Sequence, residues 1–280
     1  KQRTPLRVRR RRVRALFALA ALLLLAGCVW AVSYVSYLPR FQVSSVAVVG
    51  AQSVPAPLVQ AYVETQVFDG THPFLSRDNI LLFNAHALER EIVGYFPRVK
   101  SASVSRASML ATAVQITIAE RQPFALWCDV QNNCYEMDDT GFVFAQAANA
   151  SSTQQYVFEG GVASSSSPIG HSFAPAHLPG ILALLQMLSQ ASFTPQGATV
   201  QSDQDFSIPL NAGLPAGRQG FYIKASFGED PGSLVSNLRL ILSSDALQGK
   251  EDQIEYVDLR FGDRVYYKLK GASETKATSN

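Results

Sequence analysis

The chain has 280 residues, of which 47% are hydrophobic, and this is enough apolar material for one large folded domain or two small ones. Its formal charge of +2 is unevenly distributed, because eight of the 24 basic residues and no acidic residue lie at positions 1–14. The rest of the chain has 16 basic and 22 acidic residues, which argues against nucleic acid as a partner, since phosphate binding requires Lys and Arg spread over a folded face. The basic tip at 1–14 is suited instead to anionic lipid headgroups.

An apolar segment from Ala15 to Leu38 contains 24 residues without a charge or a proline. As a helix it would be about 36 Å long, enough to cross a hydrocarbon core of about 30 Å. By the positive-inside rule the N-terminus is expected in the cytoplasm, and the chain beyond about residue 40 outside it. The sequence therefore predicts a single-pass protein of the cytoplasmic (inner) membrane with a transmembrane helix at 15–38.

Within that segment, Leu25-Ala-Gly-Cys28 is similar to the cleavage signal of bacterial lipoproteins. However, apolar character continues for ten residues beyond Cys28, where a lipoprotein would begin a polar tether. This favours a spanning helix over lipid attachment at Cys28. The mass of the mature N-terminus distinguishes the two interpretations.

Residues 41–121 are predicted to form a small α+β domain in the order β-α-α-β-β. Pro97 ends the second helix, and Ala111 to Glu120 alternates in polarity as a half-buried strand does. An open sheet edge for docking other proteins is expected at the strand that starts with Phe41 or at the one that ends at Glu120. The predicted elements are strands at 41–50, 99–106 and 111–120 and helices at 53–67 and 85–95.

Residues 122–270 are predicted to form a larger β-rich domain with two helices. The predicted elements are three short strands within 124–146, a helix at 178–192, strands at 198–202, 206–210 and 221–227, a helix at 233–243 and a last strand within 254–270. Residues 147–176 are richer in Ser, Ala and Gly, and residues 164–167 are predicted to be a mobile loop. Residues 271–280 have nothing to pack and are predicted to be disordered.

Cys128 and Cys134 lie on either side of a polar turn at 129–133. Outside the cytoplasm such a pair is compatible with a disulfide that closes a hairpin and stabilises it by about 2 kcal/mol. Two free thiols are the main alternative. Zinc is poorly supported, because it requires four ligands and no histidine lies near in sequence.

Motifs of enzymatic chemistry are absent from the sequence, including G-x-S-x-G, H-E-x-x-H and a Walker loop. The four histidines are scattered along the chain, at His72, His86, His171 and His177. The serines at 164–167 have no base at a recognisable spacing. The sequence therefore predicts a protein that is not an enzyme and that holds no cofactor or metal.

Several short motifs stand in a characteristic order behind the basic tip and the apolar helix. They are Pro97-Arg-Val-Lys, Glu120-Arg-x-Pro-x-Ala-x-Trp127, the Asp139-x-Gly141 turn and Tyr256-Val-Asp-Leu-Arg260. With them the chain resembles, over residues 1–270, the bacterial cell-division family FtsQ/DivIB. The resemblance implies a POTRA domain at 41–121 and a β domain at 122–270. It also implies a non-enzymatic scaffold at the division septum that binds the small coiled-coil proteins FtsB and FtsL and helps control septal peptidoglycan synthesis.

POTRA units also occur in chaperones of outer-membrane assembly or secretion, and this is the alternative function. Such proteins usually carry several units or a membrane β-barrel, whereas one unit and a helical anchor are predicted here. Filamentous cells after depletion would indicate division, and loss of outer-membrane proteins would indicate the alternative. A lipid-anchored cell-wall enzyme is a third hypothesis, which requires both a lipidated Cys28 and a catalytic site that no motif marks.

The last strand is the predicted partner-binding element, because nothing structured is expected to follow it and cover its edge. The resemblance places the aromatic residue just after the D-x-R motif, here Phe261, in the FtsB-binding surface. Packing in the sheet core is the competing interpretation for each residue of the strand. The residues predicted to bind the partner are Tyr256, Asp258, Arg260, Phe261, Val265 and Tyr267.

Overall fold

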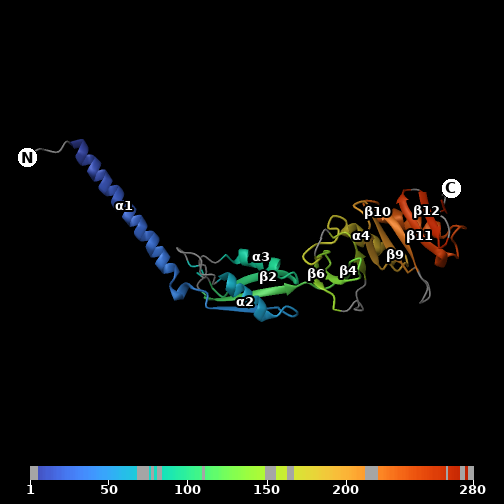
Figure 1. Ribbon diagram of the computed structural model, residues 1–280, viewed down its shortest axis with the longest axis horizontal. Coiled ribbons are helices and arrows are strands. Elements are labelled where there is room, and N and C mark those ends of the chain that lie inside the picture. Colours follow the sequence, from blue (N-terminus) through green and yellow to red (C-terminus); the bar gives the residue numbers. More distant parts are fainter. Residues whose placement is uncertain are drawn as a thin grey trace, which may run out of the picture. The chain divides into compact units, whose positions relative to one another are not determined.

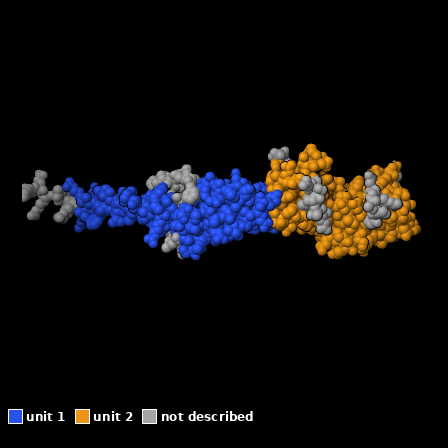
Figure 2. Space-filling view, turned by 90° about the horizontal axis from the view of Figure 1, so that it is seen from below, with its two compact units in different colours: residues 1–120 blue, residues 121–280 orange. Residues whose placement is uncertain are grey.

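The computed structural model has a mixed α+β fold with one N-terminal apolar helix and a larger sheet-rich region (Figure 1). The chain divides into two compact units, unit 1 being Lys1–Glu120 and unit 2 being Arg121–Asn280 (Figure 2). The structure describes residues 6–67, 76, 79–80, 84–108, 111–148, 156–162, 167–211, 220–262, 264–271 and 275–276. Of the predicted mobile loop at 164–167, only Ser167 lies within the described residues.

The first helix, α1 (Leu6–Ser36), contains the predicted membrane span. Its segment Arg10–Ser36 is long and apolar enough to cross a membrane, with a mean hydropathy of 2.6. The helix ends two residues before the predicted end at Leu38. The reason is Pro39, which disfavours helical backbone in the residue before it, and Leu38 is extended with φ −69° and ψ 132°.

The end of α1 is capped by residues from later in unit 1. The Ser76 backbone N–H donates to Ser36 Oγ at 2.7 Å, and the Asn79 side-chain amide donates to the Ser36 carbonyl at 3.0 Å. All three residues are buried. Because the last carbonyls of a helix have no partner within it, Asn79 satisfies a group that would otherwise be buried without a hydrogen bond.

Unit 1 contains a three-stranded sheet in the order β1-β3-β2, with β1 parallel and β2 antiparallel to β3. Its elements are β1 (Ser45–Val49), α2 (Ala56–Val67), α3 (Ala85–Tyr95), β2 (Val99–Arg106) and β3 (Ala113–Glu120), after a short 3-10 turn at Pro39–Phe41. Val114, Ile116 and Ile118 of β3 pack in one core with the apolar faces of α2 and α3. The predicted docking edge at the strand ending in Glu120 is wrong, because β3 is the central strand and the edges are β1 and β2.

Glu120 ties the end of β3 to the start of α2. Its carboxylate accepts the backbone N–H groups of Gln52, Ser53 and Val54 at 2.7–3.0 Å. Burial opposes ionisation of this carboxyl, but the hydrogen bonds from these amides outweigh it and lower the pKa of Glu120. One charged side chain therefore holds the loop that leads into α2, while Val59, Val63 and Val67 pack the helix on the core.

Unit 2 contains, among the described residues, a ten-stranded sheet in the order β13-β12-β11-β10-β9-β8-β7-β4-β5-β6. The helices α4 (Leu178–Gln190) and α5 (Pro231–Leu242) form its core together with apolar side chains of the strands, and a 3-10 turn at Glu251–Gln253 precedes β11. The strands are β4 (Ala125–Cys128), β5 (Cys134–Met137), β6 (Val143–Gln146), β7 (Val157–Glu159), β8 (Gly197–Val200), β9 (Asp205–Leu210), β10 (Phe221–Ser226), β11 (Ile254–Phe261), β12 (Arg264–Leu269) and β13 (Thr275–Lys276).

Two short strands were not predicted from the sequence. β7 lies in a segment to which the sequence prediction assigned no element, and it pairs in parallel with both β4 and β8 and buries Phe158 completely. The predicted disorder at 271–280 is wrong at Thr275–Lys276, because β13 pairs antiparallel with β12. Pairing at an edge uses backbone groups and needs no apolar pattern. Residues 272–274 and 277–280 lie outside the described residues.

A buried ion pair fixes the first hairpin of unit 2. Arg121 Nη1 donates to Asp138 Oδ2 at 2.6 Å, and the guanidinium lies 3.9 Å from the centre of the Phe142 ring. Asp138 also accepts from the Thr140 hydroxyl and from the backbone of Thr140 and Phe142. Burial opposes ionisation of Asp138, but these hydrogen bonds outweigh it and lower its pKa.

We expect Asp138→Asn to lower the free energy of unfolding at pH 7 by about 2–4 kcal/mol, because Arg121 loses its buried partner. The folded pKa is lowered, so the stabilisation by the carboxylate is present above its unfolded pKa of about 3.9 and is lost as the pH falls through the folded pKa. Urea unfolding of both proteins from pH 7 down to about pH 3 measures this. A difference that stays constant at low pH would contradict the charged pair.

Candidate partner-binding surface

The hairpin of β11 and β12 carries all six residues that the sequence predicted to bind a partner. Val257 pairs with Tyr267 and Asp258 with Tyr266. The turn contains Gly262 at φ +63°, a left-handed backbone that favours glycine, and Asp263 lies outside the described residues. The register shifts between Asp258 and Phe261, as at a β-bulge, and this changes which side chains share a face.

Val265 and Tyr267 belong to the core of unit 2. Each is 8% exposed and packs in the cluster that also contains Val257, Leu259 and residues of α4 and α5. Neither side chain is available to a partner while the unit is folded. For these two residues the structure therefore favours the competing interpretation as sheet-core residues.

The other four predicted residues differ in exposure. Tyr256 and Asp258 are 7% and 2% exposed and lie outside that core cluster. Arg260 is half-buried, and Phe261 is 54% exposed. Of the six, Phe261 is therefore the side chain that a partner reaches most directly.

The sequence prediction missed two residues of β12 whose side chains are at least partly accessible. Arg264 is exposed and Tyr266 is half-buried, and the Tyr266 ring contacts the Phe261 ring edge to face with centroids 5.0 Å apart. We call Arg260, Phe261, Arg264 and Tyr266 the hairpin surface. A prediction that allowed a bulge between Asp258 and Phe261 would have placed Phe261 on the exposed side instead of in phase with Leu259.

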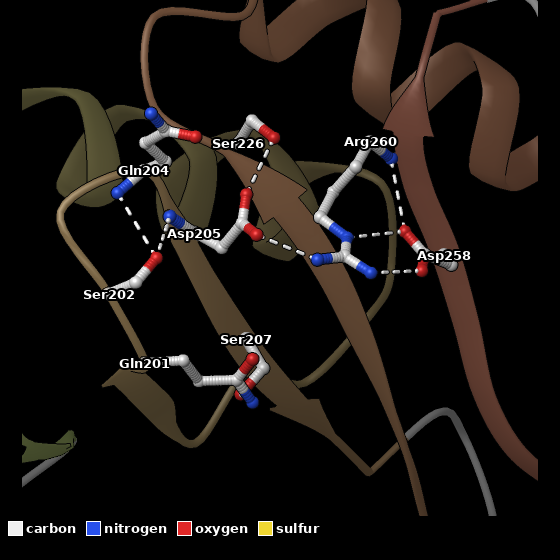
Figure 3. Close-up of polar contacts among 8 residues, drawn as sticks. All are labelled: Gln201, Ser202, Gln204, Asp205, Ser207, Ser226, Asp258 and Arg260. Carbon is white, nitrogen blue, oxygen red and sulfur yellow. Dashed lines mark hydrogen bonds and ion pairs between the residues drawn. The ribbon is translucent and has the colours of Figure 1, made fainter.

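Arg260 is held by two carboxylates from different strands (Figure 3). Its Nε and Nη2 atoms donate to the two oxygens of Asp258 at 2.8 and 2.7 Å, and Nη1 donates to Asp205 Oδ2 at 2.7 Å. Ser226 in turn donates to the other oxygen of Asp205 at 2.8 Å. Because two of these bonds form a bidentate pair, the guanidinium has one preferred orientation.

The same contacts determine the charge state of the cluster. Asp258 contributes most to raising the pKa of Arg260 above its ordinary value. The hydrogen bond from Ser226 contributes most to lowering the pKa of Asp205, with a further contribution from Arg260. Arg260 is thus a fixed cation beside Phe261, and its guanidinium carbon lies 5.7 Å from the centre of that ring.

Tyrosine and lysine side chains lie beside this cluster on the same sheet. The Lys224 ammonium is 3.9 Å from the centre of the Tyr256 ring, and the Tyr222 and Tyr256 rings are 5.4 Å apart. Lys268 of β12 forms an ion pair with Glu255 at 2.9 Å. The contacts with Lys224 and Tyr222 explain why Tyr256 is buried although its side chain is not part of the core cluster.

A pocket of about 200 Å³ lies where α4 and α5 begin, with His177, Phe227, Glu229 and Leu234 among its lining residues. The His177 and Phe227 rings are stacked at 4.0 Å. Burial, together with the charges of Asp205 and Asp258, raises the pKa of Glu229. The ionised form of Glu229 is therefore disfavoured in the folded protein.

Cys128 and Cys134 are directly opposite each other in β4 and β5 and are joined by a disulfide. Of the three interpretations left open by the sequence, the structure contains this one. The bond closes the hairpin around the turn in which Asp129 accepts the N–H groups of Gln131 and Asn133. The described part of the chain contains no group of three or more His, Cys, Asp or Glu side chains that could hold a metal ion.

Comparison of the sequence with models of known protein families finds no matching family, and no curated protein sequence matches the chain. The function of the hairpin surface must therefore be inferred from its geometry and from the sequence motifs.

We expect Glu229→Gln to stabilise unit 2 at pH 7, because the ionised carboxyl is disfavoured by burial and by Asp205 and Asp258. The folded pKa is raised, so the favourable contribution of the protonated form is complete below the unfolded pKa of about 4.3 and is lost as the pH rises through the folded pKa. Thermal unfolding of the two proteins should differ at pH 7 and coincide near pH 4. Curves that differ equally at both pH values would contradict this assignment.

We also expect the same substitution to have very different effects on stability at two neighbouring tyrosines of β12. Tyr267→Glu places a charge in the core and should lower the free energy of unfolding by at least about 3 kcal/mol. Tyr266→Glu, on the half-buried side, should change it by less than about 1 kcal/mol. Chemical denaturation measures both, and equal destabilisation would contradict the placement of Tyr267 in the core and of Tyr266 on the other face of β12.

Proposed function

We propose that this chain is a membrane-anchored scaffold of the bacterial cell-division complex, of the FtsQ/DivIB type. In this proposal residues 41–121 are a POTRA domain, the N-terminus is cytoplasmic, and the folded units lie outside the cytoplasm at the septum. A strand of an FtsB-like partner, with an FtsL-like protein alongside it, pairs with β12 and so contributes to the control of septal peptidoglycan synthesis.

The observation that carries the proposal is the position of β12 one strand from the end of the sheet, next to the exposed side chain of Phe261. The short β13 pairs with two of the six residues of β12. An edge strand presents N–H and C=O groups to which an extended segment of another protein can add. Main-chain pairing would supply affinity, and the hairpin surface would supply specificity.

Within the hairpin surface, Phe261 and Tyr266 are the best candidates for a binding hot spot. They contact each other, and large aromatic side chains with some exposed area are enriched among residues that dominate binding energy. Arg260 differs, because Asp258 and Asp205 already engage its guanidinium. A partner carboxylate would therefore compete with Asp205 for it, and Arg260 is better suited to holding the hairpin in place.

The order of the helices and strands in unit 1 supports the same proposal. The order β1-α2-α3-β2-β3 is the order expected of a POTRA domain, and it follows a single apolar helix. The chain thus combines one anchor, one small α+β unit and one sheet with an available edge. This combination suits a protein that positions others near a membrane.

The test is a pull-down of the full-length chain, in detergent, from membranes of the source cells. We expect Phe261→Glu and Tyr266→Glu to reduce capture of the FtsB-like partner at least about tenfold, as truncation of a hot spot does. Val130→Glu is the matched control, because Val130 is 92% exposed in the turn between β4 and β5, which lie toward the other end of the strand order from β12. Normal capture by both hairpin variants would refute binding at β12, and capture of no division protein by the unaltered chain would refute the function.

A further inference from the structure

The two outermost long strands of the ten-stranded sheet are both covered by backbone from this chain. At β6, the Val143 N–H donates to the His171 carbonyl at 2.9 Å, and the Gly170 N–H donates to the Val143 carbonyl at 2.8 Å. A further isolated bridge joins Phe142 and Ser172. This cover is part of the fold, because the chain runs from it directly into α4.

At the other end of the sheet the cover is β13. Tyr266 of β12 pairs with Lys276, and Tyr267 pairs with Thr275. The chain reverses at Gly271, which has φ +79° and open space around its α-carbon. The turn begins at a fixed point, because the Lys270 backbone N–H donates to the Gln253 carbonyl at 2.8 Å.

We propose that Thr275–Lys276 is a displaceable cap on the edge of β12, which protects this edge until the strand of a partner replaces it. The proposal rests on the proposed function, since it concerns the same edge. A cap of two residues is suited to exchange, because it is weak, and among the described residues β13 pairs only with Tyr266 and Tyr267 of β12. An edge without any cover would invite pairing between copies of the chain.

The cap has a measurable consequence for affinity. A segment that occupies the edge lowers the apparent affinity of the partner, because only molecules whose edge is free can bind. The reduction equals the ratio of all molecules to those with a free edge. One or two backbone hydrogen bonds of ordinary net strength correspond to a factor of about two to ten. Removal of the cap should therefore tighten partner binding about two- to tenfold.

Five variants of the full-length chain separate the cap from other effects of the tail. One ends at Gly271, and one carries Thr275→Pro with Lys276→Pro, which removes the backbone donors but keeps the length. The control carries Thr275→Ala with Lys276→Ala, which keeps these donors. Gly271→Ala strains the reversal, and its control is Gly249→Ala, because Gly249 has φ +74° and equally open space.

The first readout, hydrogen–deuterium exchange of residues 264–269, needs no partner. We expect faster exchange in the truncated, double-proline and Gly271→Ala proteins, and unchanged exchange in the double-alanine and Gly249→Ala proteins. Unchanged exchange in all variants would overturn the cap. Faster exchange in the double-alanine protein to the same extent would also overturn it, because pairing would then depend on side chains.

The second readout is titration with the partner captured in the pull-down described above. Tighter binding to the truncated and double-proline proteins supports displacement, and equal binding overturns it even where exchange is faster. If the unaltered chain and every variant capture no partner, the proposed function fails, whereas the exchange measurement still decides whether the tail caps the edge.

Discussion

Two adjacent side chains, Glu120 and Arg121, fix the chain where unit 1 ends and unit 2 begins. Glu120 accepts three backbone N–H groups at the start of α2, and Arg121 donates to the buried Asp138. No spacer separates these two anchors in the sequence. Because Asp138 also holds the turn between β5 and β6, Arg121 secures the first hairpins of unit 2, as Glu120 secures the end of β3 within unit 1.

A second pair of the same kind organises the candidate surface. Among the described residues, Asp138 and Asp258 are the carboxylates that are almost fully buried, and each is paired with an arginine. Such a charge is tolerated in a sheet only when its hydrogen bonds are satisfied, and removing one partner leaves the other uncompensated. Asp258 therefore fixes the orientation of Arg260 within β11, and Arg260 links β11 to Asp205 of β9 across the intervening β10.

The sequence predicted the elements that show a periodic pattern within their own residues. It missed the elements and contacts that depend on residues far away in the sequence. The alternation at 221–227 and the apolar stripe at 178–192 correspond to β10 and α4, because a half-buried strand and a core helix carry their own periodicity. β7 is too short to show a recognisable alternation of apolar and polar residues. The phase of Phe261 depends on a bulge, and the Asp205 partner of Arg260 lies 55 residues away, so neither leaves a local signal.

The motif residues and the candidate binding residues have different physical roles. In Tyr256-Val-Asp-Leu-Arg260, Val257 and Leu259 pack in the core, while Asp258 and Arg260 form the ion pair. These residues hold an edge in position. A strand that adds to that edge pairs mainly with backbone groups, which every residue except proline supplies in full. Under the proposed function, the motif therefore specifies where a partner strand adds, while the outward side chains of β12, which the motif does not include, determine which strand is accepted.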